Sequence, residues 1–252
     1  MKDYLDFTGK RAIVTGGRRG LGRAMALALA ERGCSVAVVS RSKEAPELLE
    51  ELNRFEGKCF YFPADLGKRE ERRGLAAKMA EALGGLDILV NNAGLQFQNE
   101  TAENCPEEQW DISRSLLLDA VYDLSRQAIP FLKASGGGKI INIASICAFR
   151  EGGWNFSYGV MKTGVMGMTR CMANTLAKYN INVNAIAPGI IRTDLTEQCF
   201  EPKRYQSIIG KYPAQRLGEP EEIAKVMLFL ACDMSSFVNG VTIPVDGGFT
   251  GN

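Results

Sequence analysis

Seven short runs with strand-like composition recur along this chain, and a stretch with helical periodicity separates each run from the next. Runs such as Ile88-Leu-Val90 and Ile140-Ile-Asn-Ile143 are mostly apolar throughout and do not alternate apolar with polar residues. A strand that is apolar on both faces is typical of a parallel sheet covered by helices on both sides. The sequence therefore predicts the α/β class and a doubly wound Rossmann fold, with a seven-stranded, mainly parallel sheet.

The predicted strands cover residues 11–15, 35–40, 59–63, 86–91, 139–143, 181–186 and 241–245, and the predicted helices lie near 21–32, 45–55, 68–83, 106–134, 157–179 and 219–231. The 252 residues, 46% of them hydrophobic, suffice for one large α/β core, so we expect residues 1–252 to form a single domain. The long irregular segment 190–212 is expected to be a lid over a substrate. An exposed basic loop without a partner is the alternative.

The first predicted strand leads into a glycine-rich turn, Gly16-Gly-Arg-Arg-Gly20-Leu-Gly22, and then into a helical pattern. Glycine at positions 16, 20 and 22 removes side chains where backbone must approach a pyrophosphate closely. The following helix directs its N-terminal N–H groups and the positive end of its dipole at such an anion. A glycine-rich turn alone is weak evidence, but this strand and helix context predicts a nucleotide-binding site.

Tyr158 and Lys162 stand four residues apart on a predicted helix, and Ser145 follows the apolar run that begins at Lys139. Residues at i and i+4 share one helix face, so the Lys162 ammonium is expected to favour the anion of the Tyr158 phenol. A phenol with an ordinary pKa of about 10 becomes a useful proton shuttle near neutral pH when a fixed cation lowers that pKa. The three residues predict a general acid/base, with Ser145 holding a carbonyl or hydroxyl oxygen. A solvated pair on an amphipathic helix is the alternative.

Composition and charge argue against several function classes. Lys+Arg 30 against Asp+Glu 29 gives a formal charge of +1, so no global field favours nucleic acid or a membrane surface. Histidine is absent, which removes the Ser-His-Asp and Cys-His arrangements and the commonest metal ligand, and we expect no metal site. Seven cysteines without a CxxC pair suit a reducing compartment. With no apolar run near the ~20 residues of a membrane span and no secretion signal, we predict a cytoplasmic protein.

Together these residues resemble the short-chain dehydrogenase/reductase family over essentially the whole chain. Its motifs occur in the family's order, as Thr15-Gly-x-x-x-Gly-Leu-Gly22, Asp65, Asn91-Asn-Ala-Gly94, Ser145, Tyr158-x-x-x-Lys162, Pro188-Gly-x-x-x-Thr193 and Val245-Asp-Gly-Gly248. The resemblance implies an NAD(P)-dependent oxidoreductase that interconverts a secondary alcohol and a ketone by hydride transfer. It gives substrate orientation to Ser145 and proton exchange to Tyr158. Lys162 would lower the tyrosine pKa and bind the nicotinamide ribose.

Cofactor contacts are implied by the same resemblance and by the glycine turn. Asp65 is expected at the adenine, Asn91 and Gly94 at the floor of the cofactor site, and Thr193 at the carboxamide end. Asp65 as a helix cap and residues 91–94 as a strand-ending turn are the alternatives. The full predicted set is Gly16, Arg18, Arg19, Gly20, Leu21, Gly22, Ser40, Arg41, Asp65, Leu66, Asn91, Asn92, Ala93, Gly94, Tyr158, Lys162, Pro188, Gly189, Ile191 and Thr193.

The end of the second predicted strand indicates which dinucleotide fits. Val38-Val-Ser40-Arg41 has no acidic side chain to accept hydrogen bonds from an adenosine 2′-hydroxyl. Arg41, with Arg18 and Arg19, instead offers guanidinium groups whose fork geometry suits a 2′-phosphate. We therefore predict NADP(H) as the cofactor in preference to NAD(H).

One position departs from the family's pattern. Aligning the helix that contains Trp110 puts Leu117 where the family usually has a catalytic asparagine, which in relatives helps hold water between the active-site lysine and solvent. Leucine neither donates nor accepts hydrogen bonds, so proton resupply is expected to rely on backbone and water. Leu117 as mere helix packing is one alternative. A shifted alignment that brings Ser113, Ser115 or Asp119 nearer the site is another.

The stretch Gly164–Gly189 is similar to the sugar-acid branch of the family, the gluconate 5-dehydrogenases and 2-dehydro-3-deoxygluconate 5-dehydrogenases, so a keto sugar acid is the leading predicted substrate. Cations expected near the pocket mouth, any of which could meet a carboxylate, are Arg150, Arg192, Lys203 and Arg204. A 3-oxoacyl thioester reductase is the alternative. From another class, the chain could be a dinucleotide-binding regulatory or structural subunit with weak turnover.

The helices near 106–134 and 157–179 carry many apolar side chains, including Leu116, Leu117, Leu118, Val165, Met166, Met168 and Met172. The family resemblance implies that these helices pack against symmetry mates, and we predict a homotetramer. The alternative is that the apolar side chains only cover the sheet.

Overall fold

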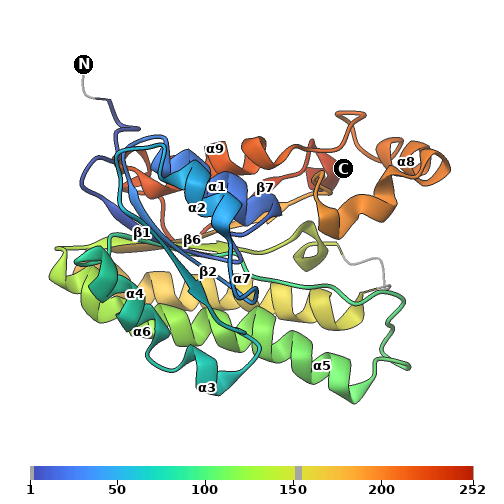
Figure 1. Cartoon of the computed structure of the whole chain (residues 1–252). Helices are drawn as coiled ribbons and strands as arrows, with labels where there is room; N and C mark the ends of the chain where they lie inside the picture. The colour runs from blue at the N-terminus through green and yellow to red at the C-terminus, as the bar shows by residue number, and fades with distance from the viewer. Residues whose placement is uncertain (1–2, 151–154, 252) are drawn as a thin grey trace.

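A seven-stranded sheet whose neighbouring strands are all parallel forms the centre of the molecule (Figure 1). The computed structural model describes residues 3–150 and 155–251, except for the side chains of Gln198, Phe200 and Lys203. The strands are β1 (Arg11–Thr15), β2 (Ser35–Ser40), β3 (Cys59–Pro63), β4 (Ile88–Asn91), β5 (Gly138–Ile143), β6 (Ile181–Pro188) and β7 (Thr242–Val245). Their order is β3-β2-β1-β4-β5-β6-β7, which confirms the predicted doubly wound Rossmann fold.

Helices cover both faces of the sheet. One face carries α1 (Gly20–Ala30), α2 (Pro46–Leu52) and α9 (Pro220–Ala231), and the other carries α4 (Leu75–Leu83), α6 (Ala120–Ala134) and α7 (Phe156–Leu176) (Figure 1). Successive strand residues serve opposite faces: Val14 packs in the core beside α1, and Ile13 packs in the core beside α4. This double burial explains the continuous apolar runs. Within the described residues, no helix has the length and apolar character needed to cross a membrane.

Two predicted helices are interrupted. The predicted helix 68–83 is split into α3 (Arg69–Arg72) and α4, because Gly74 adopts a left-handed φ of 73° between them. The predicted helix 106–134 consists of α5 (Glu107–Arg114), a π-helical turn over Ser115–Asp119, and α6. The hydrophobic periodicity of the sequence gives no sign of a π-helical turn. Such a turn is a local bulge of the kind often found at functional sites.

The segment 190–212 is less irregular than the sequence predicted. It contains a 3₁₀ turn at Asp194–Phe200 and the helix α8 (Pro202–Ile209), which stands out from the sheet at one end of the molecule (Figure 1). The side chain of Thr193 accepts the N–H of Thr196 and the hydroxyl of Thr196 accepts the N–H of Thr193, which forms a capping box at the start of the turn. The segment therefore begins with a fixed backbone.

Arg72 ties the loop after β3 to the α5–α6 segment. Its side chain is 2% exposed, and its Nε donates to Asp123 Oδ2 at 2.9 Å. Its Nη1 donates to the Leu66 carbonyl at 2.7 Å and to Ser115 Oγ at 3.0 Å. A buried guanidinium is tolerated only when its charge and its N–H groups are matched in this way.

We expect Arg72→Ala to lower the free energy of unfolding by about 3 kcal/mol, because the change strands Asp123 and two buried acceptors. Arg54→Ala is the matched control, since the Arg54–Glu50 pair is 66% and 74% exposed; its expected cost is below about 1 kcal/mol. Urea denaturation of the two variants measures both values. Equal losses would contradict the role given to Arg72.

Candidate active site

Thr15 and Asn92 fasten together the carboxyl ends of β1 and β4. Thr15 Oγ1 accepts the backbone N–H groups of Asn92 at 2.8 Å and Ala93 at 2.9 Å, and Asn92 Nδ2 donates to the Thr15 carbonyl at 2.8 Å. A Cβ on Gly16, whose φ is 66°, would stand 2.8 Å from the Ala93 Cα. A Cβ on Gly22 would stand 2.4 Å from the Gly16 carbonyl oxygen. Both positions therefore require glycine for this close packing.

A cleft of about 430 Å³ opens at these strand ends, within the size range of small-molecule sites. The predicted residues that line it are Gly16, Arg18, Arg19, Gly20, Leu21, Ser40, Arg41, Asp65, Leu66, Asn92, Ala93, Gly94, Tyr158, Lys162 and Thr193. The lining also includes residues that the sequence analysis missed, namely Ser42, Ala64, Leu95, Leu116, Ile143, Asp194 and Leu195. Apart from Leu116 and Ile143, these residues adjoin predicted ones, so extending each motif by one or two positions would have found them.

Tyr158 and Lys162 lie at the cleft on the first two turns of α7. Lys162 Nζ donates to the Ile143 carbonyl at 2.6 Å, and the side chain is 4% exposed. The Nζ atom lies 5.6 Å from the centre of the Tyr158 ring. Burial lowers the pKa of Lys162 to about 8, against a smaller opposing effect of Cys147. A cation held by a β5 carbonyl thus lies beside the phenol, as the i, i+4 spacing predicted.

Ser145 follows β5, is 7% exposed, and is not among the residues that line the cleft. Its Oγ accepts the backbone N–H of Cys147 at 3.2 Å. A hydroxyl that accepts this bond keeps its own proton for donation to another oxygen. The serine is therefore oriented as a donor two residues beyond Ile143, the residue that holds Lys162.

The predicted cofactor residues that are not part of the cleft lining are Gly22, Asn91, Pro188, Gly189 and Ile191. Asn91 is 4% exposed, and its Nδ2 donates to Ser125 Oγ at 3.0 Å and Asn142 Oδ1 at 2.9 Å. The Asn91 side chain therefore supports the floor of the cleft from within the sheet. The lack of a side chain at Gly189 lets the C-terminal segment pack closely there, because a Cβ on Gly189 would stand 3.0 Å from the Asp246 Cα.

Three arginines line the cleft near the glycine turn. Arg19 Nη1 pairs with Asp194 Oδ2 at 3.2 Å and so links the turn to the start of the 190–212 segment. Within the part of the chain that the structure describes, Arg18 and Arg41 form no ion pair. Their guanidinium groups remain available to an anionic ligand.

The turn that carries Arg41 is held by a short hydrogen-bond chain. The Tyr61 hydroxyl donates to the Ser42 carbonyl at 2.6 Å, and Ser40 Oγ lies 2.7 Å from the same hydroxyl. Because the phenol has a single proton, Ser40 must be the donor of the second bond. The chain fixes the backbone on both sides of Arg41.

Leu117 lies in the π-helical turn and is fully buried. It packs against the cleft residue Gly94, since a Cβ on Gly94 would stand 3.3 Å from Leu117 Cδ2. A shifted alignment would have brought Ser113, Ser115 or Asp119 nearer the site. Instead, Ser113 bonds Ser157, Ser115 donates to the Gly67 carbonyl, and Asp119 is half exposed. Leucine therefore occupies the position next to Gly94, and packing is part of its role.

The candidate substrate cations differ in their surroundings. Arg192 Nε pairs with Glu219 Oε1 at 3.1 Å, and Arg204 is exposed on α8. The side chain of Lys203 lies outside the described residues. Arg150 stands over the Phe249 ring at 5.9 Å, and Phe249 stacks on Tyr212 with ring centres 4.8 Å apart.

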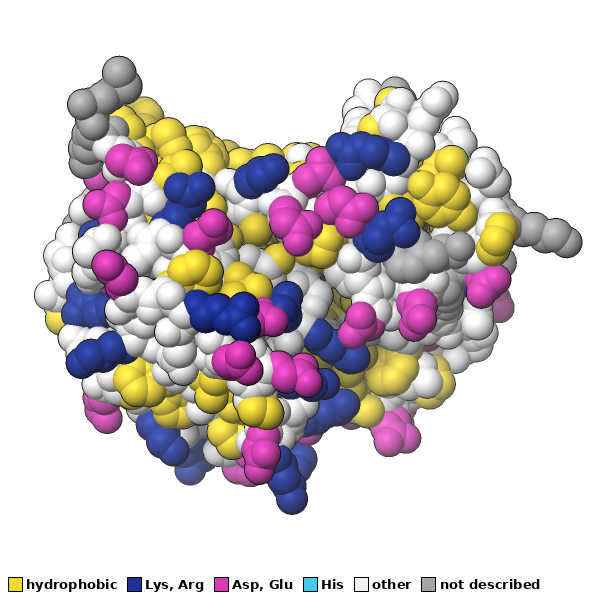
Figure 2. Space-filling view, turned by 45° about the horizontal axis from the view of Figure 1, so that its top comes forward, with side chains coloured by type: hydrophobic (Ala, Val, Ile, Leu, Met, Phe, Trp, Pro, Cys, Tyr) yellow, Lys and Arg dark blue, Asp and Glu magenta, His cyan; other side chains and the backbone are white. Residues whose placement is uncertain are grey.

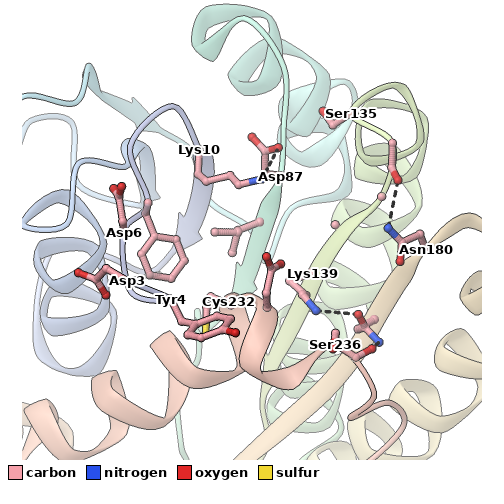
Figure 3. Close-up of a pocket in the computed structure, with 18 residues that line it drawn as sticks. Asp3, Tyr4, Asp6, Lys10, Asp87, Ser135, Lys139, Asn180, Cys232 and Ser236 are labelled. Carbon is pink, nitrogen blue, oxygen red and sulfur yellow. Dashed lines mark hydrogen bonds and ion pairs between the residues drawn. The ribbon is translucent and has the colours of Figure 1, made fainter. Parts of the chain in front are cut away.

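A second cavity of about 310 Å³ lies at the opposite, amino-terminal edge of the sheet (Figure 3). Lys10 and Asp87 point toward one another there, with Nζ and Oδ1 3.9 Å apart, and Lys139 Nζ donates to Asn182 Oδ1 at 2.7 Å (Figure 3). The ends of α6 and α9 contribute lining, so the negative ends of helix dipoles face this cavity. It is a poorer place for phosphate than the cleft at the carboxyl ends.

Comparison with known proteins agrees with this geometry. A family model described as enoyl-(acyl carrier protein) reductase matches residues 16–250. The 2-dehydro-3-deoxy-D-gluconate 5-dehydrogenase of Escherichia coli K12 is 42% identical over 243 residues, which cover 96% of this chain and 95% of that protein. The chain belongs to the short-chain dehydrogenase/reductase family. It is therefore an oxidoreductase.

Two further relatives cover nearly the whole chain. The 3-oxoacyl-acyl-carrier-protein reductase of Thermotoga maritima is 35% identical, over 95% of this chain and 97% of that protein. The crystal structure of a proposed 2-deoxy-D-gluconate 3-dehydrogenase from Agrobacterium tumefaciens, with bound NADP, has a TM-score of 0.91 and 34% identity, and the match covers 100% of both chains.

We expect Leu117→Asn to raise the steady-state turnover rate, because an amide in the π-helical turn can hold a water for proton resupply. The same change is expected to cost about 2–4 kcal/mol of unfolding free energy, since it replaces a fully buried leucine by a smaller polar group. Leu118→Asn is the control, because Leu118 lies on the same turn and packs in a separate apolar cluster. A turnover rate in Leu117→Asn that is unchanged or lower would refute a proton-supply deficit.

Proposed function

We propose that this chain is an NADP-preferring dehydrogenase/reductase that interconverts a secondary alcohol and a ketone of a sugar acid. The observation that carries the proposal is the Tyr158–Lys162 pair at a cleft built around the glycine turn. The pair supplies a proton donor and a fixed cation at the same end of the sheet as an anion-binding turn. A carbonyl reduction by hydride needs these components together.

The glycine turn fits a nicotinamide dinucleotide. Gly16 and Gly20 line the cleft with positive φ values of 66° and 55°, so bare backbone faces the ligand space. Helix α1 begins at Gly20 without a side-chain cap and without an acidic residue in its first turn, which leaves its N-terminal amides for a phosphate. When bound, the dinucleotide supplies or accepts the hydride.

The chain's own residues manage the oxygen and the proton. Ser145 donates a hydrogen bond to the substrate oxygen, and the Tyr158 hydroxyl gives that oxygen a proton as the alcohol forms. The Lys162 cation stabilises the phenolate that remains. Because burial brings the pKa of Lys162 to about 8, the lysine still carries its charge near neutral pH and exchanges protons readily there. Oxidation of the alcohol runs the same steps in reverse.

A sugar acid is favoured by the relative that acts on 2-dehydro-3-deoxy-D-gluconate, which is 42% identical to this chain. Arg150 is the best-placed cation for its carboxylate, because it follows the Ser145 turn and forms no ion pair within the described residues. Arg192 is engaged by Glu219. A 3-oxoacyl thioester is the second candidate, favoured by the Thermotoga maritima relative.

The remaining features of the proposal concern the lid, the assembly and the compartment. We propose one NAD(P)-binding domain over residues 1–252, with residues 190–212 as a lid that the Arg19–Asp194 pair anchors to the glycine turn.

Val165 and Leu117 are buried in this chain, so the proposed homotetramer would instead use the exposed Ile112, Tyr122 and Val160 on α5, α6 and α7. Light scattering that gives a monomer would refute the tetramer. Free cysteines and the mixed charge in Figure 2 suit a cytoplasmic enzyme.

Replacing Arg41 by aspartate is expected to reverse the cofactor preference. The wild type should bind NADPH more tightly than NADH, whereas a carboxylate at position 41 repels a 2′-phosphate and accepts from a ribose hydroxyl. Lys43→Asp is the control, because Lys43 is exposed two residues further on and does not line the cleft. Fluorescence titrations with both cofactors decide the matter. Tighter binding of NADH by the wild type would sink the assignment.

Activity separates the candidate substrates and tests the acid. We expect NADP⁺ reduction with 2-dehydro-3-deoxy-D-gluconate to exceed NADPH oxidation with a 3-oxoacyl thioester, measured as kcat/KM from nicotinamide absorbance. Tyr158→Phe should remove nearly all turnover and leave NADPH binding near the wild-type value, because only the acid is lost. Retained turnover in Tyr158→Phe would overturn the mechanism. Faster thioester reduction would move the assignment to the second candidate.

A further inference from the structure

Glu100 is a buried carboxylate at the start of the helix that carries Tyr158 and Lys162. Its side chain is 2% exposed, and its Oε2 accepts the backbone N–H of Ser157 at 3.1 Å and the Ser157 hydroxyl at 2.6 Å. The Glu100 carbonyl accepts the N–H of Phe156 at 3.4 Å, and residues Glu100 and Asn155 form a parallel bridge. A segment distant in the sequence thus supplies acceptors to the first turn of α7.

Helix α7 lacks a cap of its own. The N-cap side chain, Asn155, makes no capping bond, and the first turn contains no acidic residue. The first amides of a helix need acceptors, and a negative charge near them is stabilised by the helix dipole. Glu100 meets both needs from outside the helix. Its charge has no salt-bridge partner among the described residues, so the helix end and the Ser157 hydroxyl are what compensate it.

The hydrogen bonds have a direction that joins three segments. The Ser157 hydroxyl donates its one hydrogen bond to Glu100. The Ser113 hydroxyl, whose oxygen lies 2.9 Å from that of Ser157, must therefore donate to Ser157. Ser113 lies on α5, shortly before the π-helical turn. The chain Ser113 to Ser157 to Glu100 therefore binds α5 and α7 to the loop that leads from the cofactor floor at Gly94.

The carboxylate also acts on its surroundings as a charge. Burial raises the pKa of the Cys105 thiol, and the nearby Glu100 raises it further. One Glu100 oxygen, Oε1, is buried and has no hydrogen-bond partner among the described residues. Burying a carboxylate with one unpaired oxygen costs free energy of folding. The bonds that Glu100 does make must therefore stabilise the fold enough to offset that cost.

We propose that Glu100 is a positioning residue that sets the location of Tyr158 and Lys162 through Ser157. Tyr158 is the next residue after Ser157, and Lys162 lies one turn further along α7. A displacement of a reacting group by about 1 Å can cost on the order of 100-fold in rate. Loss of the carboxylate is thus expected to slow proton transfer far more than it weakens cofactor binding, because the glycine turn is unaltered and only the Lys162 contribution to the cofactor site shifts. The inference rests on the proposed function for its kinetic readout.

The test compares Glu100→Ala, Glu100→Gln and the control Glu103→Ala, which alters an exposed glutamate three residues away. We expect Glu100→Ala to lower kcat by roughly 100-fold and to change KM and the dissociation constant of NADPH by a much smaller factor. Glu100→Gln keeps an oxygen acceptor and should restore most of that loss. Glu103→Ala should match the wild type. A kcat per folded molecule that is unchanged in Glu100→Ala would overturn the proposal, as would an equal loss of kcat and cofactor affinity.

Two further measurements keep the outcome clear. Hydrogen exchange should accelerate at the first turn of α7 in Glu100→Ala and not in Glu103→Ala, and this readout does not depend on activity. Should Glu100→Ala fail to fold, Ser157→Ala removes only the hydroxyl link and is expected to give a smaller loss of kcat in the same direction. Unchanged exchange in a folded Glu100→Ala refutes the positioning role. A wild type inactive on every carbonyl substrate refutes the proposed function instead.

Discussion

The junction of β1 and β4 is the constraint on which the rest of the molecule depends. These strands are neighbours in space and far apart in the sequence, and the chain winds outward from them in opposite directions. A crevice therefore forms at their carboxyl ends. Thr15 closes the base of that crevice by accepting two N–H groups of the residues after β4, and its side chain is 2% exposed. The glycine turn packs on this base because Gly16 and Gly22 leave room for Ala93 and Asn92.

The side of the crevice to which we assign catalysis is built on the neighbouring strand, β5. Strand β5 ends at Ile143, whose carbonyl holds the Lys162 ammonium, and Ser145 follows two residues later. Helix α7 then brings Tyr158 beside that cation. The lysine is buried and partly deprived of solvent, which lowers its pKa and keeps it close to the range where protons are exchanged. The carboxyl ends of the adjacent parallel strands β4 and β5 therefore lie at the same crevice as Tyr158 and Lys162.

Much of this arrangement was predictable because it is encoded locally. Continuous apolar runs mark strands buried on both faces, a strand followed by glycines and a helix marks an anion site, and an i, i+4 pair shares a helix face. The sheet and the Tyr158–Lys162 contact agree with these predictions. The motif at residues 91–94 does not reveal that the Asn91 side chain turns into the sheet to bond Ser125.

Other features depend on contacts between distant segments, and no local pattern reports them. The π-helical turn at Ser115–Asp119 and the Arg19–Asp194 pair need the packed fold. The same holds for Glu100, which lies in an unremarkable polar loop and becomes a helix cap only when α7 is brought to it. Asn155 is a residue type that commonly caps helices, so the sequence gives no sign that its side chain makes no capping bond or that Glu100 supplies the acceptor.

The central claim is that this cleft passes a hydride between a nicotinamide and a carbinol carbon while Tyr158 handles the proton. The most direct test is the fate of deuterium placed on C5 of 2-dehydro-3-deoxy-D-gluconate during oxidation with NADP⁺, followed by NMR of the recovered cofactor. The account predicts deuterium on C4 of the nicotinamide ring, with none lost to water. Deuterium that appears in the solvent and not on the ring, during oxidation of the substrate, would contradict it.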